Sequence, residues 1–245
     1  MPTKTTLSLG ALIALAGAQS APGFPVSASQ QLTVKYGNNT VSPPGELIPR
    51  GETASPPSIS SPVWYAGERG ASPGLLLMVD IDVPRNGTRV PLLHWMATNV
   101  TSQGSSGALN VPNSPVPYLQ PSPPVGDVPH AYTFIVFPQP ANFTVPAKYL
   151  ALAQNQSLRV GFNTSAFIAE VGLKQAIAAN YITVQNLTGT AATTFPPARP
   201  TQSPSATPSK PAQFTGTAPL SMVGGATMWA GLAAAMLAGV AAVAL

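Results

Sequence analysis

The run Leu75-Leu-Leu-Met-Val-Asp-Ile-Asp-Val-Pro84, which is followed after a polar turn by Leu92-Leu-His-Trp95, decides the fold. An apolar run that ends in two aspartates predicts a buried strand over 75–82, ended at Pro84 because proline cannot donate to a ladder. Side chains alternate along a strand, so Asp80 and Asp82 are expected on one face at its end. Core packing alone does not require such a pair.

The scarce polar residue types gather around this run. The 245 residues include only three aspartates and two histidines, and Asp80, Asp82 and His94 lie within fifteen positions of one another. Asp127 and His130 lie together in a second short stretch. This clustering indicates a functional site at the end of the strand, although each histidine alone could be a core residue bonded to a carbonyl.

Period-two patterns predict further strands at 31–36, 92–100, 130–137 and 179–184, with an edge strand within 58–64. In the 92–100 strand the pattern places Leu92, His94 and Met96 on one face, and Leu93, Trp95 and Ala97 on the other. In the 130–137 strand it places His130, Tyr132, Phe134 and Val136 together. A helix is expected over 164–171, capped by Asn163 or Thr164 and ended by Gly172.

The two ends of the chain differ from its middle. Residues 1–18 have a lysine, an apolar stretch and small residues at the end, which is typical of a signal peptide rather than a buried helix. Residues 191–219 have the Ser/Thr/Pro composition of a disordered stalk. Residues 220–245 predict a GPI-attachment signal with a hydrophobic tail; a retained membrane span is the alternative. A domain at 24–190 remains, expected at the cell surface, anchored to the plasma membrane or cell wall.

Composition fits a secreted glycoprotein. The chain has no cysteine, so its stability depends on a core alone. The net charge of +4 comes from sparse residues with no basic run, which does not favour nucleic acid as a partner. Seven sequons predict glycosylation at Asn38, Asn86, Asn99, Asn142, Asn155, Asn163 and Asn186.

Four motifs carry a resemblance to a known family. They are Asp80-Ile-Asp82-Val-Pro84, Leu93-His94-Trp95, Tyr118-x-x-Pro121-Ser-Pro123-Pro124 and His130-Ala131-Tyr132-Thr-Phe134. In order and spacing they resemble the phosphatidylethanolamine-binding protein family, which includes Raf kinase inhibitor proteins and a carboxypeptidase Y inhibitor. The resemblance covers about 31–184, and the architecture of the ends suggests a fungal form. Two positions depart from the family pattern: Ile81 stands where proline is usual, and Ala131 where arginine is common.

The resemblance implies a mainly β fold, in which a large central antiparallel sheet packs with a smaller sheet and one or two short helices. It also implies a small anion pocket for phospholipid headgroups or similar phosphate or carboxylate groups. Carried over by motif, the ligand-binding residues are Asp80, Asp82, His94, Pro121, Pro123, His130 and Tyr132.

Two imidazoles and a phenol can donate to an oxyanion, while nearby carboxylates tune the histidines; binding is then expected to weaken as pH rises through a histidine pKa. No cofactor and no metal are expected, although two carboxylates and an imidazole could in principle hold a divalent ion. We therefore expect a non-enzymatic binding protein. The alternatives are a protease inhibitor or signalling-partner binder acting through the loop face 115–129, and a phosphoester hydrolase, which would lack a Gly-x-Ser-x-Gly nucleophile elbow.

Overall fold

The computed structural model describes residues 19–64, 66–67, 70–71, 73–103, 106–191 and 194–200. All of them belong to the first of two compact units, 1–204. The predicted signal peptide and the predicted anchor signal lie outside the described residues. Within those residues no helix is long and apolar enough to cross a membrane.

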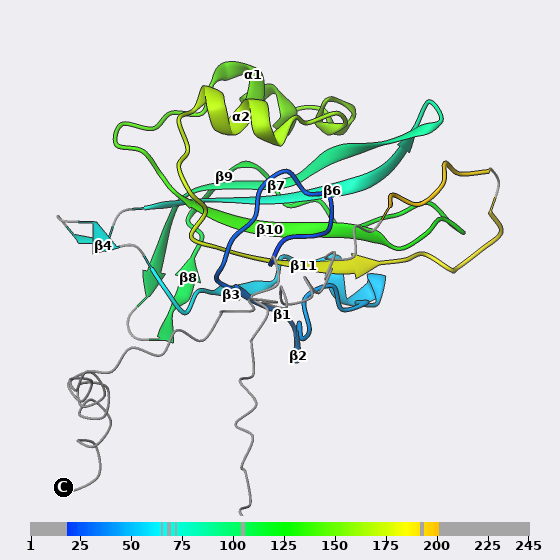
Figure 1. The fold of residues 1–245 in the computed structure, drawn as a ribbon, viewed down its shortest axis with the longest axis horizontal. Coiled ribbons are helices and arrows are strands. Elements are labelled where there is room, and N and C mark those ends of the chain that lie inside the picture. The colour runs from blue at the N-terminus through cyan, green and yellow to red at the C-terminus, as the bar shows by residue number, and fades with distance from the viewer. Residues whose placement is uncertain are drawn as a thin grey trace, which may run out of the picture. The chain divides into compact units, whose positions relative to one another are not determined.

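One antiparallel sheet of nine strands forms most of the domain (Figure 1). Its strand order is β11-β10-β6-β7-β8-β3-β1-β2, and β9 pairs with β7 beside this path. A separate two-stranded sheet joins β4 (Ala66–Gly67) to β5 (Gly70–Ala71). The strands of the large sheet are β1 (Thr33–Tyr36), β2 (Asn39–Thr40), β3 (Ser58–Ser60), β6 (Gly74–Arg85), β7 (Thr88–Gln103), β8 (Ala108–Asn110), β9 (Asn113–Val116), β10 (His130–Pro138) and β11 (Ala178–Val184).

The large sheet curls so that its two ends approach each other. Strand β7 belongs to both halves, pairing with β6 along most of its length and with β8 at its end. The first half ends at β11, and two parallel bridges, Gln31 with Ala179 and Leu47 with Thr183, connect β11 to the chain around β1. The mainly β, antiparallel fold expected from the sequence is confirmed.

Strands β6 and β7 form the longest hairpin, visible in Figure 1. Strand β6 does not end at Pro84, as the sequence predicts; it continues to Arg85, with Pro84 paired to Arg89. The reason is that β10 pairs with β6 only as far as Asp80, so beyond that point β6 has one neighbour and an open edge. Proline is tolerated on an open edge because no partner needs its missing N–H.

A β-bulge places His94. Met78 pairs with Trp95 and the next residue, Val79, pairs with Leu93, so His94 is an extra residue on β7. The predicted alternation therefore fails across this point. Leu93 and Trp95 do not share a face: Leu93 lies in one hydrophobic core and Trp95 in the other.

Two hydrophobic cores lie on opposite faces of the β6–β7–β10 sheet. One contains Leu76, Met78, Trp95, Phe134 and, from the other half of the curled sheet, Val34. The other contains residues such as Leu77, Ile135 and Phe137 and is covered by the helical segment. The shared face predicted for His130, Tyr132, Phe134 and Val136 is confirmed for the last three, which all lie in the first core.

Two short α-helices cover the second core, α1 (Ala147–Leu150) and α2 (Thr164–Glu170). They are accompanied by the 3₁₀ turns η3 (Ala151–Ala153) and η4 (Gln156–Arg159); η1 (Arg50–Ala54) lies earlier in the chain. Helix α2 matches its prediction: the Asn163 side chain accepts from the Ala166 N–H, and Gly172, at a φ of 68°, follows the C-cap. Strand β3 differs from its prediction, since it lies between β1 and β8 rather than at an edge.

Candidate functional site

Three neighbouring strands bring the predicted site residues together. Tyr132 on β10 pairs directly with Asp80 on β6, and His130 begins β10 two residues earlier. His94 approaches from β7, on the other side of β6, because of the bulge. The His94 and Tyr132 rings contact edge to face, with 4.9 Å between their centroids, and the His130 and Tyr132 centroids are 6.4 Å apart. All four side chains are buried.

His130 is held between two carboxylates. Its Nδ1 lies 2.8 Å from Asp80 Oδ2, and its Nε2 lies 3.0 Å from Asp127 Oδ2. Burial alone would lower the pKa of His130, but the hydrogen bonds and charges of Asp80 and Asp127 raise it overall. His130 is therefore an imidazolium with both N–H groups already used, and it orients the carboxylates instead of facing a ligand.

Asp127 is also paired with a buried arginine. Arg89 on β7 donates to both of its carboxylate oxygens, at 2.7 and 3.1 Å, and to the Asp82 carbonyl at 2.6 Å. Burial would raise the pKa of Asp127, but Arg89 and His130 hold it below its ordinary value. Arg89, Asp127, His130 and Asp80 thus form one continuous line of alternating charges.

Asp82 lies beside this line and is bonded to the backbone. Its Oδ2 accepts from the Ala131 N–H at 2.9 Å, and its own N–H donates to Asp80 Oδ1 at 2.7 Å. Burial is the main reason that the pKa of Asp82 is raised. The second bond shows that the two aspartates converge although Ile81, buried in the core, separates them.

The protonation of His94 differs from that of His130. Its Nδ1 donates to the Leu119 carbonyl at 2.8 Å, which leaves Nε2 facing Asp80 Oδ2 at 4.0 Å. Burial lowers the pKa of His94, although the charge of Asp80 opposes the effect. A neutral ring with a proton on Nδ1 has a lone pair on Nε2, so His94 presents an acceptor until it is protonated.

The hydroxyl of Tyr132 lies in the cluster without a hydrogen-bond partner among the described residues. The Tyr132 side chain is fully buried. Burial raises the pKa of Tyr132 well above its ordinary value, and the negative charge and close approach of the Asp80 carboxylate raise it further, so the phenol keeps its proton. The site therefore contains a buried O–H donor that lies near Asp80 without a well-formed hydrogen bond.

A buried cation fixes the loop that holds His94. Arg159 is 4% exposed, and it donates to the carbonyls of Leu152, Pro117 and His94 at 3.0, 2.8 and 3.3 Å. Leu119, two residues after Pro117, also donates its N–H to the His94 carbonyl. Arg159 thus ties the loop to β7 and secures the carbonyl that sets the His94 tautomer.

Of the predicted ligand-binding residues, the structure brings together Asp80, Asp82, His94, His130 and Tyr132. Pro121 and Pro123 are buried in the loop between β9 and β10. The contacts that this loop makes with the cluster run through Leu119 and Asp127. That Pro121 and Pro123 bind a ligand stays a prediction.

Sequence reasoning noted Asp127 beside His130 without counting it among the ligand-binding residues, and it missed Arg89 and Arg159 as parts of the site. Asp127 had a signal, because it is one of three aspartates and lies three residues before His130. Arg89 and Arg159 had none, since their roles depend on contacts with residues distant in the sequence.

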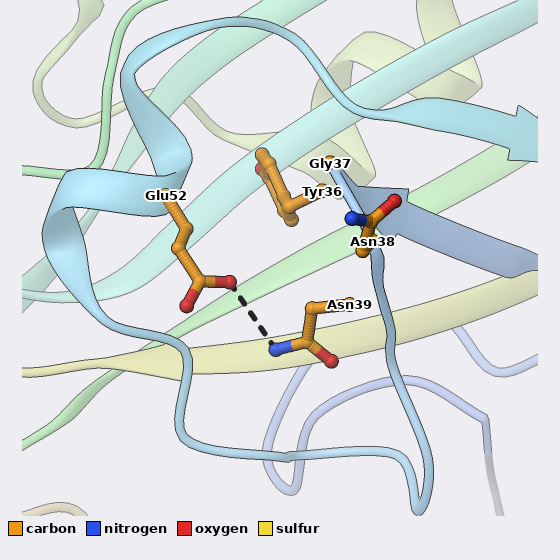
Figure 2. A pocket seen from close by; sticks show the side chains of 5 residues that line it. All are labelled: Tyr36, Gly37, Asn38, Asn39 and Glu52. Carbon is orange, nitrogen blue, oxygen red and sulfur yellow. Dashed lines mark hydrogen bonds between the residues drawn. The ribbon is translucent and has the colours of Figure 1, made fainter.

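A surface hollow in the described part of the chain lies away from this cluster. Figure 2 shows it at the β1–β2 turn, where Asn39 Nδ2 donates to Glu52 Oε2 at 3.3 Å. None of its lining residues (Tyr36, Gly37, Asn38, Asn39 and Glu52) belongs to the buried cluster. It includes the predicted glycosylation acceptor Asn38, which is exposed.

Comparison with known proteins identifies the family. Residues 26–192 match the family model "Phosphatidylethanolamine-binding protein". The chain belongs to this family. A curated relative from Talaromyces stipitatus, "Phomoidride biosynthesis cluster protein N", is 32% identical over 185 residues, which cover 70% of this chain and 93% of the relative. The "26 kDa secreted antigen" of Toxocara canis is 29% identical over 156 residues, which cover 62% of this chain and 55% of that protein.

A solved structure supports the fold of this phosphatidylethanolamine-binding protein family member. The structure of carboxypeptidase Y inhibitor complexed with its cognate proteinase matches with a TM-score of 0.51 and 18% identity. The match covers 65% of this chain and 85% of the other. Family membership establishes a ligand-binding fold, and it leaves the ligand of this chain to be argued from the site.

Proposed function

We propose that this protein is a non-enzymatic binding protein of the cell surface, whose buried cluster takes a phospholipid headgroup or a similar phosphate or carboxylate group. The observation that carries the proposal is the buried Tyr132 hydroxyl without an acceptor. Leaving a buried donor unpaired costs about 1–3 kcal/mol, so its presence is accounted for if a ligand oxygen accepts that bond.

The charge state of His94 sets how an anion would bind. A neutral His94 turns a lone pair toward the site, which would repel a ligand oxygen. An anion close to Nε2 favours the imidazolium, since an opposite charge stabilises the charged form. Binding is then coupled to protonation of His94, and affinity falls as pH rises through the pKa of His94 in the complex. The same direction is expected from the sequence.

The direct test is a calorimetric titration with phosphoethanolamine at pH 6 and pH 8. We expect tighter binding at the lower pH, proton uptake in buffers of different ionisation enthalpy, and loss of binding in His94→Ala and Tyr132→Phe. Tyr118→Phe is the matched control, because that hydroxyl is used inside the protein, donating to the Thr53 carbonyl at 2.7 Å. Equal affinity in Tyr132→Phe and the wild type would remove the proposal.

The non-enzymatic part of the proposal rests on how the acids and bases are used. Asp80 and Asp127 are bonded to His130, and His130 has no free nitrogen, so His94 and Asp82 are the acid–base groups of the cluster that no imidazole holds. The name of the Talaromyces relative refers to a biosynthesis cluster, which makes a turnover assay necessary. Hydrolysis of a phosphodiester that depends on His94 and persists after metal removal would replace binding with catalysis.

The cell-surface part of the proposal rests on the two chain ends and on the sequons. Six of the seven sequon asparagines are exposed, as glycosylation at these positions would require. Asn186 is half-buried, and its Nδ2, the atom that would carry the sugar, donates to the Pro123 carbonyl at 3.3 Å. Release of the protein from cells by a phosphatidylinositol-specific phospholipase supports the GPI anchor. Retention in the membrane after that treatment, with a control GPI protein released, argues for a spanning tail.

A further inference from the structure

A segment beyond the family-matched region lies against the site. Residues 194–200, here named the strap, follow the match at 26–192 and lie inside the stalk that the sequence predicts. Arg89, the buried partner of Asp127, donates from Nε to the Pro197 carbonyl at 3.0 Å and from Nη2 to the Pro196 carbonyl at 2.8 Å. One guanidinium therefore binds both the charge line of the site and the strap.

The strap also delivers a cation to the site. Arg199 Nε lies 3.6 Å from Asp82 Oδ1, and its Nη2 donates to the Gly23 carbonyl at 3.4 Å. The Asp82 side chain is 10% exposed with this arginine in place, and the Arg199 side chain is 29% exposed. Arg199 thus forms the outer surface of the cluster at Asp82.

Charge balance explains why a cation is favoured there. The cluster contains three carboxylates, on Asp80, Asp82 and Asp127, and the described cations bonded to it are Arg89, His130 and Arg199. Arg89 and His130 bond Asp127 and Asp80, so Asp82 depends on Arg199. If the strap leaves, Asp82 faces solvent uncompensated and attracts another cation.

The strap is the least firmly held cover of the site among the described residues. The loop 117–129 is attached by backbone bonds, including Leu119 N–H to the His94 carbonyl and Gly126 N–H to the Asn186 carbonyl. The described bonds of the strap come only from the arginines at 89 and 199. A segment held by a few side-chain bonds opens before one held by backbone bonds.

We propose that the strap is an intrachain cover of the binding site, and that Arg199 occupies at Asp82 the position that a cationic group of the ligand takes when the strap opens. The inference rests on the proposed function and adds to it a segment of this chain that competes with the ligand for Asp82. A zwitterionic headgroup, with a phosphate for Tyr132 and an ammonium for Asp82, replaces both missing interactions at once. A plain phosphate leaves Asp82 unpaired.

The experiment uses the full chain with two matched charge reversals. Arg199→Glu places a negative charge against Asp82 and should open the strap, whereas Lys174→Glu makes the same charge change at an exposed residue that follows helix α2 and has no described bond to the cluster or the strap. Calorimetry with phosphoethanolamine and with inorganic phosphate gives affinities. Hydrogen exchange of the peptide 127–133, measured by mass spectrometry without any ligand, reports how often the strap opens.

We expect Arg199→Glu to bind phosphoethanolamine at least about threefold more tightly than the wild type, since it exchanges a partly exposed ion pair for a repulsion of similar size. It should prefer phosphoethanolamine over phosphate, and it should exchange faster at 127–133. Lys174→Glu should match the wild type in each measurement.

The failures of the two proposals are distinguishable. If the wild type binds and Arg199→Glu binds equally or more weakly, the cover is overturned and the binding function stands. If Arg199→Glu binds phosphate with the same affinity as phosphoethanolamine, Asp82 takes no ligand cation, and the proposed role of Asp82 is overturned. If neither the wild type nor the variants bind either probe, the binding function fails. Hydrogen exchange at 127–133 then tests the cover by itself: faster exchange in Arg199→Glu than in the wild type supports it, and equal exchange overturns it.

Discussion

Replacing Tyr132 with phenylalanine should stabilise this protein, against the usual direction of a buried Tyr→Phe change. A buried hydroxyl normally makes a hydrogen bond, and its loss costs stability. The Tyr132 hydroxyl has no such partner among the described residues, and its side chain is fully buried. The substitution therefore removes a desolvation cost from the folded state and removes no well-formed hydrogen bond, since the hydroxyl only approaches the Asp80 carboxylate.

The size of the effect follows from two opposing terms. An unsatisfied buried donor costs about 1–3 kcal/mol. The missing oxygen leaves a void on the order of 15 Å³, which at about 24 cal/mol per Å³ costs roughly 0.4 kcal/mol. We expect the free energy of unfolding to rise by about 0.5–2.5 kcal/mol, a midpoint increase of roughly 0.3–1.2 M urea at a slope of about 2 kcal/mol/M.

The assay is urea unfolding of wild type and Tyr132→Phe without ligand, followed by circular dichroism. Tyr118→Phe is the control, because its hydroxyl donates to the Thr53 carbonyl and lies 3.2 Å from the Tyr36 hydroxyl. That variant should lose about 0.5–1.5 kcal/mol. If Tyr132→Phe is destabilised by a similar amount, the hydroxyl has a partner in solution and the argument for an open donor is refuted.

The remaining predictions concern the charged residues around Tyr132. The pKa of His130 is raised in the folded state above its ordinary 6.5. The contribution of His130 to the free energy of unfolding is therefore complete below about pH 6.5 and is lost as pH rises through the folded pKa. Urea midpoints should fall as pH rises over this range, and the fall should be smaller in His130→Gln. Arg89→Met should cost about 3–5 kcal/mol, because the buried Asp127 loses its bidentate partner and keeps His130 alone; adding Asp127→Asn should recover part of this, and a double variant no more stable than Arg89→Met would argue against the pair. Arg159→Met should lower the free energy of unfolding by at least about 2 kcal/mol, because the Leu152 and Pro117 carbonyls lose their donor and the His94 carbonyl keeps only the Leu119 N–H, and it should weaken phosphoethanolamine binding; an unchanged urea midpoint would show that the carbonyls find other donors.

Much of the fold was predictable from local patterns. The strands at 130–137 and 179–184 and the helix at 164–171 were found within a few residues, because alternation, capping and glycine placement act locally. The run of β6 through Pro84 was not predictable, since it depends on which neighbour β6 has at that point.

Some members of the site were predictable from the sequence, but their roles were not. Rare residue types marked Asp80, Asp82, His94 and His130, and the register of β6 and β10 brought them together. The opposite protonation of the two histidines depends on partners that no local pattern indicates: a loop carbonyl for His94 and the Asp127 carboxylate for His130. The bulge that aims His94 likewise arises from pairing with β6 rather than from the sequence of β7 alone.

The most direct test of the account is a crystal structure of the domain soaked with phosphoethanolamine at pH 6. The account predicts a phosphate oxygen within hydrogen-bond distance of the Tyr132 hydroxyl and of His94 Nε2. Phosphate bound elsewhere, for example in the hollow at the β1–β2 turn, with the Tyr132 hydroxyl still unpartnered, would contradict it.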